Sequence, residues 1–169
     1  MGLTFKGGFH VHDGKELTKD KPVRTAPTPE MVVVPLSQHI GAPCEASVKK
    51  KDEVKMGQPV GEAKGFVSAP VHSPVSGVVV DVKAAPHSSG GRVLSVIIEN
   101  DGEDTMFEGI GEKVDPSSLS REEIVERVKN AGIVGLGGAT FPAHVKLSPP
   151  KDKPIDTIVI NGAECEPLL

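Results

Sequence analysis

Four glycines fall within seven residues of the stretch AGIVGLGGATFPAHVKL, which runs from Ala131 to Leu147. They are Gly132, Gly135, Gly137 and Gly138, and Lys146 follows them. Because glycine has no Cβ, such a loop lets backbone N–H groups approach phosphate oxygens, and a lysine adds a positive charge. The spacing is neither that of a P-loop nor that of a dinucleotide-binding G-x-G-x-x-G after a strand. The pattern therefore indicates either a phosphate site or a tight turn.

A helix is predicted before this loop and a strand after it. In DPSSLSREEIVERVKNAG, Ser120 and Glu123 form a capping box, and Gly132 can take the left-handed conformation after the helix end. The apolar stripe of this helix consists of Ile124, Val125 and Val128. The run TIVIN, residues 157–161, is typical of a strand buried on both faces. This order predicts the start of an α/β domain, so we expect the sequence to be part of a longer protein.

The stretch from Met31 to Asn100 shows short apolar runs separated by turns, without a helical period. It predicts a compact all-β barrel or sandwich. The first 30 residues are polar and contain three prolines, so we expect an extended arm. The arm also contains His10, His12 and Asp13, but no further ligands follow at a metal-binding spacing, and we expect no metal site.

The overall composition excludes some classes of function. Lys and Arg number 19 against 23 Asp and Glu, a net charge of −4, which predicts no general attraction to nucleic acid or anionic lipid. Cys44 and Cys165 lie far apart and form no disulfide framework, which suits a reducing compartment. Cys165 has no C-x-x-C partner, so we expect a small buried side chain rather than a redox thiol.

The β region resembles biotinyl and lipoyl carrier domains, a fold also called the barrel-sandwich hybrid. VKMGQ at Val54–Gln58 and SPVSGV at Ser73–Val78 fit the two ends of the carrier pattern. The register between them places Phe66 at the hairpin tip, where carriers have their modified lysine, and Lys64 lies two positions away. We therefore expect a structural or docking module. The alternative is a cofactor carrier, which mass spectrometry would reveal as an adduct on Lys64.

A longer pattern is more specific. GLGGATFPAHVKL followed by VINGAECEP resembles the flavin-binding segments of the flavoprotein subunit of respiratory complex I, which hold FMN and NADH. With FKGGFHVHDGKELT near the N-terminus and the hybrid module, nearly the whole chain resembles the C subunit of the Rnf complex, an ion-translocating ferredoxin:NAD oxidoreductase. The A subunit of the sodium-pumping NADH:quinone reductase shares this architecture and is an alternative, as is a non-catalytic docking module.

The resemblance implies eight cofactor-binding residues and assigns no catalytic or metal-binding residue. They are Gly135, Gly137, Gly138, Phe141, Lys146, Asn161, Glu164 and Glu166. The glycines would lie close to FMN and the dinucleotide, Phe141 near the adenine of NADH and Lys146 near the flavin phosphate, and the last three residues would face the flavin and nicotinamide. Alternatively, Phe141 is a core aromatic and the two glutamates cap a following helix. Two positions depart from the pattern, because Ala163 replaces an Asp and Thr140 replaces a Gly.

The sequence thus predicts a mixed α and β chain in three parts. These are an extended N-terminal arm (1–30), a barrel-sandwich hybrid domain (31–105) and the first part of an FMN/NADH-binding α/β domain (106–169). The resemblance implies FMN and NAD(H) in the intact subunit, with two 4Fe-4S clusters only in a C-terminal part outside this sequence. It also implies other Rnf subunits as partners, at the cytoplasmic side of the membrane. We expect this stretch to be inactive alone.

Overall fold

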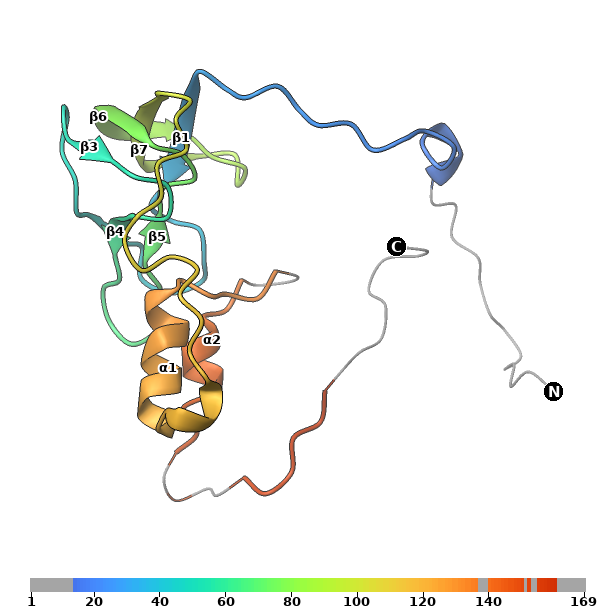
Figure 1. The fold of residues 1–169 in the computed structure, drawn as a ribbon, viewed down its shortest axis with the longest axis vertical. Coiled ribbons are helices and arrows are strands. Elements are labelled where there is room, and N and C mark those ends of the chain that lie inside the picture. The colour runs from blue at the N-terminus through green and yellow to red at the C-terminus, as the bar shows by residue number, and fades with distance from the viewer. Residues whose placement is uncertain (1–13, 137–139, 151, 153–154, 161–169) are drawn as a thin grey trace. The chain divides into compact units, whose positions relative to one another are not determined.

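The computed structural model describes residues 14–136, 140–150, 152 and 155–160. The chain divides into two compact units (Figure 1), one of residues 28–155 and the other of residues 1–27 with 156–169. The larger unit contains β1 (Met31–Pro35), β2 (Glu45–Ala46), β3 (Glu53–Val54), β4 (Pro59–Glu62), β5 (Val71–His72), β6 (Gly77–Pro86), β7 (Arg92–Asn100), the 3-10 helix η2 (Pro116–Ser118), α1 (Arg121–Asn130) and α2 (Ala143–Lys146).

Two antiparallel sheets make up the β part of the larger unit. One sheet has the order β1-β7-β6-β3 and the other the order β2-β4-β5. In the first sheet Val34 of β1 lies opposite Val96 of β7, and Gly77 of β6 lies opposite Asn100. A β-bulge between Val79 and Asp81 bends β6. The apolar runs identified in the sequence therefore form the predicted strands.

Both sheets contribute to one core. Its fully buried members are mostly β-branched, and the cluster consists of Val34, Leu36, Cys44, Val54, Val60, Val71, Val75, Val79, Val96 and Ile98. Burial of each large apolar side chain contributes about 1.5–3 kcal/mol. The Cys44 thiol donates to the carbonyl oxygen of Ala69 at 3.0 Å, and burial raises its pKa. This core confirms the barrel-sandwich hybrid prediction.

The helical segment follows the sheets. The capping box of α1 is present, since Ser120 Oγ accepts from the backbone N–H of Glu123 and the Glu123 carboxylate accepts from that of Ser120. Gly132 has φ +68° and ends the helix as predicted. The N–H groups of Gly132 and Ile133 donate to the carbonyls of Lys129 and Val128, which is a Schellman motif. The predicted apolar stripe is only half covered, and Ile124 remains 37% exposed.

The smaller unit differs from the prediction. Residues 157–160, the described part of TIVIN, form no strand, and the side chains of Ile158, Val159 and Ile160 are 80–88% exposed. The prediction of a buried strand is therefore wrong for these residues. A strand must pair its backbone N–H and C=O groups with a neighbour, and none of the described strands pairs with this segment.

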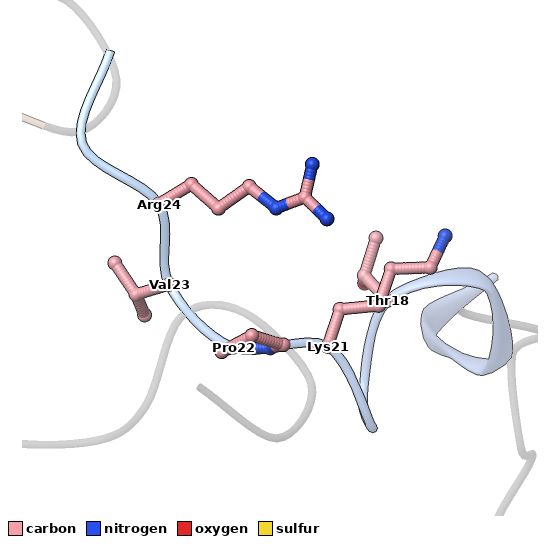
Figure 2. Close-up of a pocket in the computed structure, with 5 residues that line it drawn as sticks. All are labelled: Thr18, Lys21, Pro22, Val23 and Arg24. Atoms are coloured by element: carbon pink, nitrogen blue, oxygen red, sulfur yellow. The ribbon is translucent and has the colours of Figure 1, made fainter.

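The described part of the N-terminal arm contains the 3-10 helix η1 (Lys15–Leu17), and residues 16–30 are exposed. Figure 2 shows a shallow pocket on this arm, lined by Thr18, Lys21, Pro22, Val23 and Arg24. All five residues come from one short exposed stretch, so the pocket is not a binding site built from several elements. His10, His12 and Asp13 lie outside the described residues.

Candidate nucleotide site and its contacts

The glycine loop is closed at its base like a hairpin. Gly135 donates its N–H to the carbonyl oxygen of Phe141 at 3.0 Å, and Ala143 donates to Ile133 at 2.9 Å. Between these bonds Val134 and Pro142 form an antiparallel bridge. The loop therefore returns to the point where it started, so its two ends have fixed positions.

The backbone at Thr140 explains one departure from the flavoprotein pattern. Thr140 has φ +48°, a left-handed conformation that is uncommon for a β-branched residue and costs on the order of 1–2 kcal/mol. Glycine, which the resemblance places here, adopts this conformation without strain. Thr140 thus keeps the backbone course that glycine would give the loop.

Three of the eight predicted cofactor-binding residues are described, and the closing end of the loop brings them together. Besides the Gly135–Phe141 bond, the Lys146 Nζ lies 6.0 Å from the centroid of the Phe141 ring, at the outer limit of a cation–π contact. Phe141 is half-buried and Lys146 is exposed. The other five predicted residues lie outside the described part of the chain: Gly137, Gly138, Asn161, Glu164 and Glu166.

The closing end of the loop also contacts the hybrid domain, which the sequence did not predict. His144 of α2 is 3% exposed, and its Nε2 lies 3.0 Å from the carbonyl oxygen of Phe66. The two rings meet edge to face, with centroids 6.2 Å apart and an interplanar angle of 87°. Phe66 belongs to the loop of residues 63–70 between β4 and β5, which we call the tip loop. The aromatic residue at the carrier-lysine position was the sequence signal for this contact.

A second contact joins the same region to the end of α1. His72 Nε2 lies 3.0 Å from the carbonyl oxygen of Asn130, in the last turn of the helix. A Cβ on Gly132 would lie 2.5 Å from the carbonyl oxygen of Pro70, so the two backbones approach more closely than any other residue allows. The start of the glycine loop is therefore held against the hybrid domain as well.

The His72 contact predicts a dependence of stability on pH. Burial lowers the pKa of His72 below its ordinary value of 6.5, and the bond to Asn130 offsets only part of this effect. The folded state then binds a proton less tightly than the unfolded state, so the stabilisation is complete above pH 6.5 and is lost as the pH falls through the folded pKa. In urea titrations the free energy of unfolding of the wild type should fall more between about pH 7.5 and pH 5 than that of His72→Gln. Equal decreases would contradict this role of His72.

Lys64, the alternative carrier lysine, has a local partner. Its Nζ lies 2.7 Å from a Glu45 carboxylate oxygen, and this interaction raises the pKa of Lys64. The contact is exposed and contributes little to stability. Phe66, in contrast, contacts a second structural element, which supports the docking interpretation of the tip loop.

Residues 14–136, 140–150, 152 and 155–160 contain no group of three or more His, Cys, Asp or Glu side chains placed to hold a metal ion. Within the same residues, no helix has both the length and the apolar character that a membrane span requires.

Comparison with known protein families agrees with this architecture. Residues 3–103 match the model of the RnfC barrel sandwich hybrid domain. Residues 128–169, which include the glycine loop, match the model of the Nuo51 FMN-binding domain.

Three relatives are similar over almost the whole chain, and each is named as the C subunit of its complex. That of the Na(+)-translocating ferredoxin:NAD(+) oxidoreductase complex of Acetobacterium woodii is 55% identical over 166 residues, and that of the proton-translocating complex of Clostridium ljungdahlii is 48% identical over 169 residues. That of the ion-translocating oxidoreductase complex of Rhodobacter capsulatus is 44% identical over 171 residues. The matches cover 98–100% of this chain but only 38%, 37% and 33% of these relatives. With its hybrid domain followed by the flavin-type glycine loop, this chain belongs to the RnfC family, the C subunits of Rnf complexes.

Proposed function

We propose that this chain is the part of an Rnf-type ferredoxin:NAD oxidoreductase subunit that begins the FMN and NADH site. The observation that carries the proposal is the glycine loop, closed at its base and followed by Lys146, in a segment similar to the Nuo51 FMN-binding domain. The relatives are named as subunits of a complex, so the proposal includes other Rnf subunits as partners and a peripheral position at the cytoplasmic face of the membrane. It keeps the division into an arm, a hybrid domain and a flavin-site segment at residues 30/31 and 105/106.

The described residues fit an FMN phosphate, although they divide the work unequally. Lys146 places an exposed positive charge at the closing end of the loop, next to the Phe141 ring. The N–H of Gly135 is already donated to Phe141, so Gly135 contributes space rather than a hydrogen bond to the phosphate. When bound, FMN supplies the chemistry that takes a hydride from NADH and releases single electrons. The residues of this chain would bind and orient it.

The proposal predicts that Lys146→Met weakens FMN binding by the natural full-length polypeptide about 10- to 100-fold. A charge-assisted hydrogen bond contributes roughly 1.5–3 kcal/mol, and about 1.4 kcal/mol corresponds to a factor of ten. Quenching of flavin fluorescence would measure the dissociation constant. Lys129→Met, which removes a lysine from the exposed surface of α1, is the matched control and should leave the affinity unchanged. Equal affinities of the two variants would argue against the role of Lys146.

A second candidate function is a docking module without nucleotide chemistry. It is favoured by Phe66, which stands at the carrier-lysine position and contacts α2. In that case the wild-type full-length polypeptide would bind neither FMN nor NADH. A polypeptide similar to that of the sodium-pumping NADH:quinone reductase would give the same result with NADH, so NADH titration is the second measurement.

A further inference from the structure

The tip loop holds both ends of the glycine loop. Before the loop, Gly132 approaches Pro70, and His72 bonds to the carbonyl of Asn130. After the loop, His144 bonds to Phe66. We propose that Phe66 and His144 form a positioning contact, through which the hybrid domain sets the place of Phe141 and Lys146 in the flavin site. This inference rests on the proposed function and adds to it a working role for the hybrid domain.

The contact orients the His144 ring in one way. A carbonyl oxygen only accepts hydrogen bonds, so Nε2 carries the proton and donates to Phe66. Nδ1 is buried and has no hydrogen-bond partner among the described residues. The bond to Phe66 is therefore the polar interaction by which the described structure fixes the direction of this ring.

The tip loop is a firm support for such a contact. Ser68 is fully buried, donates its hydroxyl to the carbonyl of Ala42 at 2.9 Å and accepts from the N–H of Lys64 at 3.1 Å. Ala42 in turn donates its N–H to the carbonyl of Val67 at 3.1 Å. These bonds attach the loop on both sides of Phe66 to the hybrid domain, so Phe66 has a defined position before any ligand binds.

The position of α2 depends on contacts of this kind. The helix spans only four residues, too few to be stable by itself. His144 lies two residues after Pro142, which is fully buried, and two residues before Lys146. A shift of His144 therefore moves both Lys146 and the loop end at Phe141. Contacts that fix such side chains decide how well a binding site is formed before its ligand arrives.

The test measures FMN affinity in the natural full-length polypeptide. We expect Phe66→Ala and His144→Phe to weaken FMN binding about tenfold, because each removes part of the contact. His144→Gln keeps a donor near the position of Nε2 and should restore most of the affinity. Leu94→Ala removes a similarly exposed apolar side chain from β7 and should have no effect. Unchanged affinity in both Phe66→Ala and His144→Phe would overturn the inference.

Hydrogen exchange without FMN separates this inference from the proposed function. Amides of residues 141–148 should exchange about tenfold faster in Phe66→Ala than in the wild type or in Leu94→Ala. If the wild type binds no FMN, the proposed function fails, and faster exchange would still support the positioning contact. If the wild type binds FMN but neither the affinity nor the exchange changes in Phe66→Ala, the inference fails and the proposed function remains.

Discussion

Replacement of Gly77 by alanine should destabilise the hybrid domain by at least about 3 kcal/mol. Gly77 begins β6 at φ +148° and lies opposite Asn100 of β7 and Val54 of β3. A Cβ there would lie 1.9 Å from the backbone carbonyl oxygen of Glu99. Backbone strain alone costs on the order of 1–3 kcal/mol, and the clash also separates two strands that enclose the core. For a domain stable by about 5–15 kcal/mol this is a large share.

Gly65 provides the matched control for this prediction. It has φ +92°, but no atom lies within 4 Å of an added Cβ. Gly65→Ala therefore carries the conformational cost, about 1–2 kcal/mol, without the clash. Urea denaturation followed by circular dichroism would compare the free energies of unfolding of the two variants. Similar losses would show that the close approach of β6 to Glu99 has no energetic weight.

Local patterns in the sequence predicted the elements that depend on neighbouring residues. The capping box at Ser120 and Glu123 and the left-handed Gly132 form as expected because their partners lie within a few residues along the chain. The runs that became β6 and β7 pair with each other through a short turn. The order of short motifs, rather than any one of them, indicated the family, and the family models match the same two regions.

Features that depend on distant partners could not be derived in this way. TIVIN has the composition of a buried strand, but its burial depends on neighbouring strands that the described residues do not provide. The contact between Phe66 and His144 joins residues 78 positions apart in the sequence, and only the fold brings them together. The sequence showed that Phe66 replaces the carrier lysine. It did not show that the helix after the glycine loop would pack against it.

The second large effect is expected at Gly132, where an alanine should loosen the glycine loop from the hybrid domain. Like Gly77, this residue combines a left-handed backbone with a close approach, here 2.5 Å between an added Cβ and the carbonyl oxygen of Pro70. The same Cβ would lie 3.0 Å from the His72 ring, whose bond to Asn130 holds the end of α1. We expect a loss of about 2–3 kcal/mol in the free energy of unfolding.

Gly109→Ala distinguishes this effect from the conformational cost alone. Gly109 has φ +82° and open space around an added Cβ, so only about 1–2 kcal/mol should be lost. Hydrogen exchange should be faster across residues 121–136 and 140–148 in Gly132→Ala and unchanged there in Gly109→Ala. If the full-length polypeptide binds FMN, its affinity should fall about tenfold in Gly132→Ala only, because the start of the glycine loop loses its support. An unaltered exchange pattern in Gly132→Ala would mean that α2 and Phe66 alone fix the loop.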